Sequence, residues 1–237
     1  MNIFSESIIL IPTLREKDNL RNLLPAIFDL MPDISVLVTD DNSGDGTVEL
    51  IQDFKKNFTR LFLLERKDNF GYGKAILDGM RWIAGKDYNW VITMDSDFSH
   101  DFKDIPEIIK KLQDKDVVLG SRYINGGKIE NWSFFRKFLS RFANFYVDIV
   151  LGTDFSDSTT GFVGYNKTSI KKLIDKKPTS GGYAFLVESK YVLSKDNLKF
   201  CEHPITFRER RQGQSKMSYK IIWESIWMPW KLKLQKR

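Results

Sequence analysis

The sequence predicts an α/β fold in which a mostly parallel sheet is flanked by helices. Up to about residue 119, short apolar runs alternate with stretches of helical periodicity, which is typical of repeated strand–helix–strand units. The apolar runs are continuous, as expected for strands that are buried on both faces. With 237 residues, of which 42% are hydrophobic, the chain is long enough to bury one such domain.

The predicted elements follow one another from the N-terminus. The first strand is the apolar run Ser7–Ile11, which ends at Pro12. Apolar residues then recur with a helical period from Leu20 to Met31 and predict an amphipathic helix. The alternation continues with strands at Ile34–Val38, Leu61–Leu64, Trp90–Met94 and Val117–Leu119, and with helices around Val48–Phe58, Ile76–Ile83 and Ile105–Leu112.

The chain changes character after Tyr123. An aromatic-rich helix with interleaved basic residues is predicted at Trp132–Val150, and a loop is predicted at Asp154–Gly161. No internal repeat or low-complexity linker divides the chain. We therefore expect one domain over residues 1–220, followed by a basic, Trp-rich C-terminal tail at residues 221–237.

The predicted aromatic helix and the C-terminal tail share a composition that is typical of membrane interfaces. In both segments Phe or Trp side chains lie close to Lys and Arg. Amphipathic segments of this kind bury aromatic rings at the lipid boundary and hold basic side chains near the head groups. A stripe of Phe residues is more often part of a protein core, so the pattern alone leaves both interpretations open.

The composition narrows the chemistry that the chain can perform. A single cysteine, Cys201, excludes a disulfide framework and a thiolate zinc cluster, and two histidines exclude a His-rich metal site. The net charge of +6 favours anionic partners such as phosphates or acidic lipids. Because we find no signal peptide and no apolar run of about 18 residues, we expect a cytoplasmic protein that is peripheral on the cytoplasmic face of a membrane.

Polar clusters follow three of the predicted strands, at Pro12–Glu16, Asp40–Asp45 and Asp95–Asp97. Because the carboxyl ends of parallel strands meet at one edge of a sheet, where such sheets bind ligands, we expect these clusters to converge. Asp95 and Asp97 are suited to bind a divalent cation together with substrate phosphates. The alternative is a solvated turn in which an Asp caps a helix.

Basic residues form a further group of candidates. Arg122 follows the strand Val117–Leu119 at the same sheet edge, and a guanidinium matches the geometry of phosphate oxygens. For any single arginine elsewhere, a solvated basic surface is the simpler interpretation. The remaining candidates in this group are Arg136, Arg141, Arg208, Arg210, Arg211 and Lys216.

Together these motifs resemble family 2 glycosyltransferases, and specifically the dolichol-phosphate or polyprenol-phosphate mannose synthase branch. The resemblance runs from about Ile8 to Lys220. It is carried by IPTLRE, TDDNSGDGT, NFGYGKA, MDSDFSH, GSRY, GGKIENW, DSTTGF, GYAF and PITFRERRQGQSK. It implies a GT-A fold, a Rossmann-like domain that binds a nucleotide-sugar and a metal ion, Mg²⁺ or Mn²⁺.

The resemblance also implies roles for individual residues. The nucleoside pocket would be formed by Pro12, Leu14, Glu16, Thr39 and Asp41. The diphosphate and metal site would be formed by Asp95, Ser96 and Asp97, with Ser99 completing the metal shell. The donor and acceptor phosphates would be held by Arg122, Arg136, Ser140, Arg210 and Lys216. Arg15 departs from the family pattern, since it stands where the family usually has Asn.

The activity implied by the resemblance is metal-dependent, inverting transfer of a sugar to a polyprenyl or dolichyl phosphate, with GDP-mannose as the first-choice donor. Such an acceptor is already anionic, so the reaction needs no protein base, and no His or Glu is obviously placed to act as one. Three alternatives remain open. They are a UDP-sugar donor carrying glucose or an N-acetylhexosamine, transfer to a glycan hydroxyl, and a non-catalytic nucleotide-binding subunit.

The expected partners follow from this activity. They are a nucleotide-sugar, a polyprenyl phosphate and a membrane surface. Some family members carry transmembrane helices that this chain does not show, so a separate membrane-spanning subunit is a further candidate. A nucleic-acid partner is not expected, because the acidic clusters at the sheet edge would repel a phosphate backbone.

Overall fold

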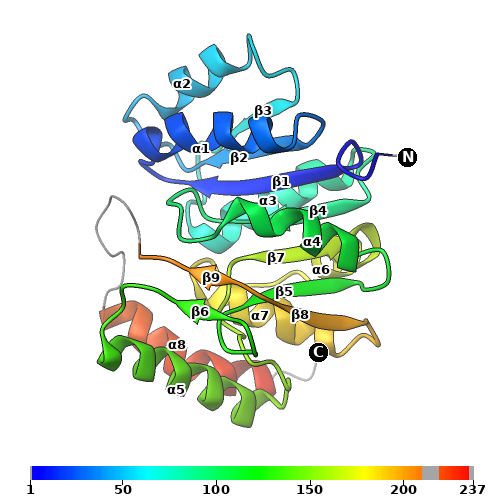
Figure 1. Ribbon diagram of the computed structural model, residues 1–237. Helices are drawn as coiled ribbons and strands as arrows, with labels where there is room; N and C mark the ends of the chain where they lie inside the picture. Colours follow the sequence, from blue (N-terminus) through cyan, green and yellow to red (C-terminus); the bar gives the residue numbers. More distant parts are fainter. Residues whose placement is uncertain (1, 210–218, 235–237) are drawn as a thin grey trace.

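The computed structural model describes residues 2–209 and 219–234 and contains a central seven-stranded sheet with helices on both faces (Figure 1). The strand order is β3-β2-β1-β4-β7-β5-β8. The strands of this sheet are β1 (Ser7–Thr13), β2 (Ser35–Asp40), β3 (Leu61–Glu65), β4 (Trp90–Thr93), β5 (Val117–Ser121), β7 (Val163–Asn166) and β8 (Phe200–Pro204). A small second sheet pairs β6 (Lys128–Ile129) with β9 (Thr206–Phe207).

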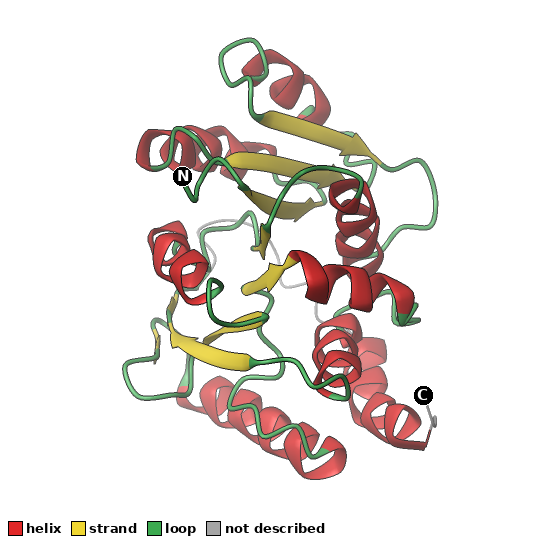
Figure 2. Ribbon diagram, turned by 90° about the vertical axis from the view of Figure 1, so that its right-hand side faces the viewer, coloured by secondary structure: helices red, strands yellow, loops and turns green. Residues whose placement is uncertain are grey.

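The helices that cover the sheet are distributed over both faces, as Figure 2 shows in the turned view. Their bounds are α1 (Lys17–Leu30), α2 (Thr47–Phe54), α3 (Tyr72–Ala84), the short 3₁₀ helix η1 (Phe102–Asp104), α4 (Ile105–Lys111), α5 (Phe134–Leu151), α6 (Lys167–Asp175), α7 (Ala184–Ser194) and α8 (Tyr219–Leu234). The predicted alternation of strands and helices up to β5 is therefore confirmed.

Strand β1 shows why the sheet needs helices on both of its faces. Its side chains alternate in direction, so Ile9 and Ile11 join a core cluster formed with α1, α2 and α4. Ile8 and Leu10 join a second cluster formed with α3, α6 and α7. All four side chains are fully buried, which explains the continuous apolar run in the sequence.

The sheet is mostly parallel, and its exception is β7. Strands β1, β2, β3 and β4 pair in parallel, as do β5 and β8, whereas β7 runs antiparallel between β4 and β5. The apolar pattern of the sequence predicts no strand at β7, which is only four residues long and contains Gly164, or at β8, whose sequence FCEHP has no continuous apolar run. A side chain at Gly164 would press into Ile108, since an added Cβ would lie 2.6 Å from its Cγ2 atom.

The C-terminal helix α8 packs beside α5 at the bottom of the view in Figure 1. Met228 and Leu232 of α8 share a buried cluster with Val147 and Leu151 of α5 and with Val187 of α7. Residues 226–234 of the expected tail are thus packed on the domain. The boundary at residue 220 stays a prediction.

Candidate functional site

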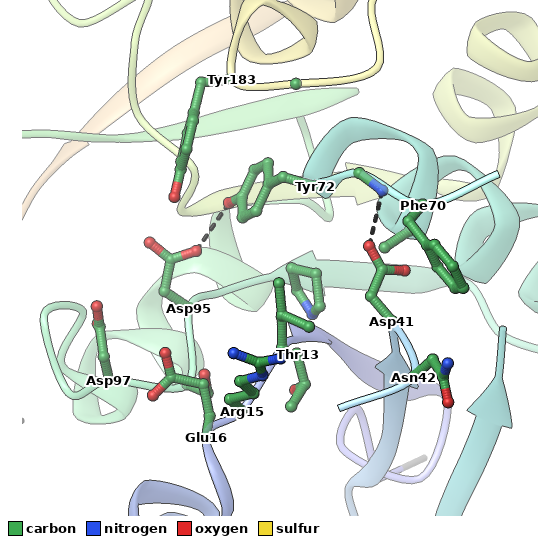
Figure 3. Close-up of a pocket in the computed structure, with 16 residues that line it drawn as sticks. Thr13, Arg15, Glu16, Asp41, Asn42, Phe70, Tyr72, Asp95, Asp97 and Tyr183 are labelled. Atoms are coloured by element: carbon green, nitrogen blue, oxygen red, sulfur yellow. Dashed lines mark hydrogen bonds between the residues drawn. The ribbon is translucent and has the colours of Figure 1, made fainter. Parts of the chain in front are cut away.

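A cavity of about 540 Å³ lies at the carboxyl ends of β1, β2 and β4, where the sequence places its polar clusters (Figure 3). We call it the carboxyl-edge cavity. Its lining residues are Pro12, Thr13, Leu14, Arg15, Glu16, Asp41, Asn42, Phe70, Gly71, Tyr72, Ala75, Asp95, Ser96, Asp97, Gly182 and Tyr183. Seven predicted site residues therefore meet here, namely Pro12, Leu14, Glu16, Asp41, Asp95, Ser96 and Asp97.

The turn after β1 is fastened to the loop after β2. The backbone N–H of Arg15 donates to Ser43 Oγ at 2.8 Å, and that of Lys17 donates to Asp45 Oδ2 at 3.2 Å. Ser43 is itself held by Asp40, which accepts hydrogen bonds from its backbone N–H and its hydroxyl. Two polar clusters that are far apart in the sequence therefore form one continuous wall of the cavity.

Asp41 anchors the loop between β3 and α3. Its carboxylate forms a buried ion pair with Arg66 and accepts the backbone N–H of Gly71 at 2.7 Å. Arg66 also contacts Asp78 of α3 at 2.9 Å, so it links the end of β3 to α3. Sequence reasoning missed Arg66, although its place directly after β3 could have indicated it.

Asp95 is held from two sides. Its backbone N–H donates to His100 Nδ1 at 3.1 Å, and its Oδ1 accepts the Tyr72 hydroxyl at 2.7 Å (Figure 3). Burial lowers the pKa of His100, which keeps the imidazole neutral and suits its role as an acceptor. Burial, with Asp95 adding to it, raises the pKa of Tyr72, so the phenol stays protonated and donates. Tyr72 also stacks on Tyr183, with ring centroids 4.8 Å apart.

The residues around Asp97 fit a divalent cation. Asp97 Oδ1 accepts the backbone N–H of Ser99 at 3.1 Å. The Ser99 hydroxyl is buried and has no hydrogen-bond partner among the residues that the structure describes. An unpartnered buried hydroxyl two residues after Asp97 suits a cation that takes its remaining ligands from carboxylates and substrate phosphates.

Thr39 lies elsewhere than predicted for a nucleoside contact. It is fully buried in β2, its hydroxyl lies 3.5 Å from the Ile11 carbonyl oxygen, and it does not line the cavity. Its methyl group faces α3 at Gly79, where an added Cβ would come within 3.0 Å of it. The structure therefore places Thr39 in the packing beneath the cavity.

Arg122 lies in a second polar region, which we call the Arg122 cluster. Its guanidinium forms two hydrogen bonds of 2.7 Å with Asp157 and one of 2.7 Å with Thr159. The rings of Tyr123, Trp132 and Phe207 surround it, with centroids 5.2 to 5.9 Å from the guanidinium carbon. Burial lowers the pKa of Arg122, but Asp157 outweighs this effect and raises it.

A buried lysine lies close to this pair. Lys190 is only 1% exposed, and its ammonium donates to the carbonyl oxygens of Thr160 at 2.7 Å and Leu186 at 2.8 Å. Burial lowers the pKa of Lys190 to about 7, against an opposing effect of Asp157. The loop that carries Asp157 is thus held by Arg122, which follows β5, and by Lys190 of α7. Sequence reasoning singled out neither Asp157 nor Lys190.

The remaining predicted phosphate contacts lie on α5 or outside the described residues. Arg136 stacks on Trp132 at 3.9 Å and pairs with Glu209 at 3.0 Å, while Ser140 Oγ accepts the Tyr123 hydroxyl at 2.7 Å. Ser140 therefore adjoins the Arg122 cluster. Arg210 and Lys216 lie outside the described residues.

The exposed faces of α5 and α8 carry many large apolar side chains. Phe134 is 85% exposed and Trp227 is 63% exposed. The other exposed apolar side chains of the two helices are Phe135, Phe138, Leu139, Phe142, Phe145, Ile149, Ile226, Trp230 and Leu234. No helix in residues 2–209 and 219–234 is long and apolar enough to cross a membrane.

Comparison with known sequences decides the family. The sequence model described as Glycosyl transferase family 2 matches residues 8–174, which include every lining residue of the carboxyl-edge cavity except Gly182 and Tyr183. The chain belongs to glycosyl transferase family 2. It is therefore a glycosyltransferase, as its motifs predicted.

Two curated relatives of this family 2 chain are similar over nearly its whole length. An undecaprenyl-phosphate mannosyltransferase of Micrococcus luteus is 33% identical over 217 residues, which cover 92% of this chain and 89% of the relative. A polyprenol monophosphomannose synthase of Mycolicibacterium smegmatis is 33% identical over 226 residues, which cover 93% of this chain and 84% of the relative.

Solved structures of glycosyltransferases support the fold. Glucosyl-3-phosphoglycerate synthase from Mycobacterium tuberculosis, in complex with Mn²⁺, UDP and phosphoglyceric acid, has a TM-score of 0.69 at 14% identity. The alignment covers 96% of this chain and 77% of that one. A complex of the same enzyme with Mn²⁺, UDP and glucosyl-3-phosphoglycerate has a TM-score of 0.66. The GT-A fold of this family 2 chain is therefore confirmed.

Proposed function

We propose that this family 2 glycosyltransferase transfers mannose, with GDP-mannose as the first-choice donor, to a polyprenyl phosphate in the presence of Mg²⁺ or Mn²⁺. The observation that carries the proposal is the 33% identity, over nine-tenths of the chain, to relatives named as polyprenol-phosphate mannose transferases. The acidic carboxyl-edge cavity supports it, because its size and place in the sheet suit a nucleotide-sugar.

In this proposal the carboxyl-edge cavity binds the donor. Pro12, Leu14 and Glu16 of the first wall and the side chain of Asp41 contact the nucleoside. The stacked rings of Tyr72 and Tyr183 form the opposite wall, so that the sugar and the diphosphate lie between the two walls near Asp95. A divalent cation bound by Asp95 and Asp97, with Ser99 as a further ligand, would offset the charge on the departing diphosphate.

The acceptor phosphate supplies its own nucleophile. One of its anionic oxygens attacks the anomeric carbon in line with the departing diphosphate, and a single displacement inverts that carbon. His100 is unsuited to act as a base on the acceptor, because its Nδ1 already accepts a backbone N–H and its ring is buried. The protein's part is then to hold two anions side by side in an attack geometry.

Basic side chains also offset the charge of the acceptor phosphate. In this proposal Arg136, Arg210 and Lys216 contact the phosphate, and Ser140 donates a hydrogen bond to it. Arg122 is committed to Asp157 and Thr159, so it acts mainly by fixing the loop that carries them and by adding positive potential. A role of Arg122 in direct contact with a phosphate would require it to leave Asp157.

We propose that α5 and α8 bind the surface of the membrane that contains the acceptor lipid, on its cytoplasmic face. The exposed Phe and Trp side chains of the two helices form an apolar surface. The same helices carry the exposed Lys231 and Lys233 and the half-buried Lys137. Aromatic rings inserted among lipids, with lysines at anionic head groups, would bring the active site to its lipid substrate.

A donor screen tests the proposed reaction. Purified protein is incubated with Mg²⁺ or Mn²⁺, short-chain polyprenyl phosphate in detergent, and GDP-mannose, UDP-glucose or UDP-N-acetylglucosamine. Lipid-linked mannose formed from GDP-mannose supports the proposal. Product from a UDP-sugar would keep the mechanism and overturn the donor, whereas no lipid product from any donor would overturn the acceptor or require a membrane-spanning partner.

Liposome flotation tests the membrane surface independently. The double substitution Phe138→Ser and Phe142→Ser on α5 is expected to weaken binding to anionic liposomes about ten-fold or more, since each change removes an exposed aromatic ring. GDP binding serves as the control and should not change, because neither residue lines the carboxyl-edge cavity. Unchanged flotation would overturn the membrane role of α5.

A further inference from the structure

The carboxyl-edge cavity has an unusual distribution of charge. Its lining includes four carboxylates, those of Glu16, Asp41, Asp95 and Asp97, and Arg15 is the one basic side chain among the described residues that line it. Asp41 is already paired with Arg66 behind the cavity wall. A nucleotide-sugar brings a negatively charged diphosphate into this acidic space, so its binding needs positive charge from elsewhere.

The backbone at Arg15 shows that its position is built into the fold. Arg15 has φ = 58°, in the left-handed region that residues with bulky side chains rarely adopt. The hydrogen bond from its N–H to Ser43 Oγ, at 2.8 Å, holds this conformation. Residues that the surrounding structure holds in a strained backbone conformation cluster at ligand sites, so this conformation favours a ligand-binding role for the Arg15 side chain.

The Arg15 side chain is available to a ligand. It is exposed, and Figure 3 shows the guanidinium pointing into the cavity, between Glu16 and Asp41 in that view. Within residues 2–209 and 219–234 the guanidinium forms no ion pair, in contrast to the guanidiniums of Arg66 and Arg122. An exposed guanidinium inside a cavity is suited to donate two parallel hydrogen bonds to phosphate oxygens.

A divalent cation does not remove the need for this arginine. A metal ion at Asp95 and Asp97 offsets about the charge of those two carboxylates, so the diphosphate would still add uncompensated negative charge next to Glu16. Arg15 lies on the same turn as Glu16 and supplies the missing cation at that wall. A neutral residue in its place would leave Glu16 as the one charged side chain among the described lining residues from Pro12 to Glu16.

We propose that Arg15 binds the diphosphate of the nucleotide-sugar donor and thereby determines how tightly this chain holds its donor. The inference rests on the proposed function, since it assumes that the carboxyl-edge cavity takes a nucleoside diphosphate sugar. The contact is made by the phosphate groups, so it does not depend on which base the donor carries.

The test compares nucleotide binding by three variants of the full chain. Arg15→Asn removes the charge, and Asn tolerates the left-handed backbone well. Arg15→Lys keeps the charge but loses the planar fork. Arg21→Asn is the matched control, because Arg21 is exposed on α1 and does not line the cavity. The affinities for GDP, UDP, guanosine and uridine are measured by titration with and without Mn²⁺, and thermal unfolding confirms that each variant is folded.

The proposal predicts a selective loss. Arg15→Asn should weaken GDP and UDP binding about ten-fold or more, the size expected for a lost hydrogen bond to a charged group, and should leave the two nucleosides unchanged. The affinity of Arg15→Lys for GDP and UDP should lie between that of Arg15→Asn and that of the unmodified chain. The affinity of Arg21→Asn should equal that of the unmodified chain. The loss should be larger without Mn²⁺, because the arginine then carries more of the charge compensation.

The opposing outcomes separate this inference from the proposed function. If the unmodified chain binds GDP or UDP and Arg15→Asn binds them equally well, the role of Arg15 is overturned while the donor site stands. A loss that is equal for guanosine and GDP would place Arg15 at the base and would also overturn the diphosphate contact. If the unmodified chain binds neither nucleotide, the proposed function and this inference both fail.

Discussion

The carboxyl-edge cavity takes most of its lining from the ends of β1, β2 and β4 and the residues that follow them, whereas the Arg122 cluster is assembled from distant segments. Arg122 follows β5, Trp132 precedes α5, Asp157 lies in the loop after α5, and Phe207 belongs to β9. The cavity is acidic and open to a ligand, while the cluster is buried and its charges are already paired.

The difference indicates that the cavity serves mainly ligand binding and the cluster serves mainly stability. Parallel strands bring their following loops to one edge regardless of what lies further along the chain, so a donor site can be built by local sequence. The cluster depends on long-range packing, and its buried pair costs stability whenever one partner is lost. We therefore expect substitutions in the cavity to reduce activity first, and substitutions in the cluster to reduce stability first.

The largest effect on activity is expected at the proposed metal site of the cavity. Asp97→Asn should lower kcat/KM at least about 100-fold, because a carboxylate that holds the charge-neutralising cation is lost. The measurement is lipid-linked sugar formation at several Mn²⁺ concentrations. The exposed Asp114→Asn is the control and should keep full activity. Undiminished metal-dependent transfer by Asp97→Asn would refute the metal assignment.

The largest effect on stability is expected in the Arg122 cluster. Asp157→Asn leaves the guanidinium of Arg122 buried without its charged partner, which should lower the free energy of unfolding by about 3 kcal/mol or more. Urea unfolding measures this loss. Asp53→Asn breaks an exposed ion pair with Lys56 and should change stability by less than about 1 kcal/mol. Equal effects of the two changes would show that the cluster does not hold its loop.

A smaller effect is expected where the cavity positions its own carboxylate. Tyr72→Phe removes the hydroxyl that donates to Asp95 Oδ1 and should weaken Mn²⁺ binding about ten-fold, as is usual for the loss of a group that orients a metal ligand. Titration of Mn²⁺ in the presence of GDP measures this change. Tyr88→Phe loses a hydrogen bond to Ser35, far from the cavity, and should bind Mn²⁺ normally. An unaltered Mn²⁺ affinity for Tyr72→Phe would mean that the Tyr72 hydroxyl does not orient the Asp95 carboxylate for metal binding.

The smallest change expected within one pH unit is a pH dependence of stability in the Arg122 cluster. Burial lowers the pKa of Lys190 to about 7, below its value of 10.5 in the unfolded chain. Between these two values the unfolded state binds more protons, so Lys190 makes stability rise with pH in this window and fall as the pH drops toward 7. Lys190→Met removes this slope, which is at most about 1.4 kcal/mol per pH unit.

Urea unfolding of both chains at pH 9, 8 and 7 measures the predicted change. Lys190→Met loses the hydrogen bonds to Thr160 and Leu186, so it is expected to be the less stable chain at pH 9. Its deficit should shrink toward pH 7. The exposed Lys56→Met is the control and should show no such trend. A constant deficit for Lys190→Met would mean that Lys190 stays charged in the folded protein.

Much of the cavity could be predicted because its residues follow strands. Continuous apolar runs such as Ser7–Ile11 indicated strands buried on both faces, and parallel strands then placed Pro12–Glu16 beside Asp95–Asp97. The partners that fix these residues were harder to find. Tyr72 and Tyr183 are far apart in the sequence, and only the packing of α3 against α7 stacks one ring on the other.

The sequence by itself determined the alternation of strands and helices, the family, and the edge of the sheet at which the acidic clusters converge. These features depend on the periodicity of apolar residues and on motifs within short segments, and both can be read from the sequence without knowing the fold. Only the tertiary structure decided that Thr39 lies beneath the cavity, that Arg122 is paired with Asp157, and that β7 runs antiparallel. Each of these depends on contacts between distant segments, whose pairing is selected by packing and charge burial in the folded chain and not by local sequence.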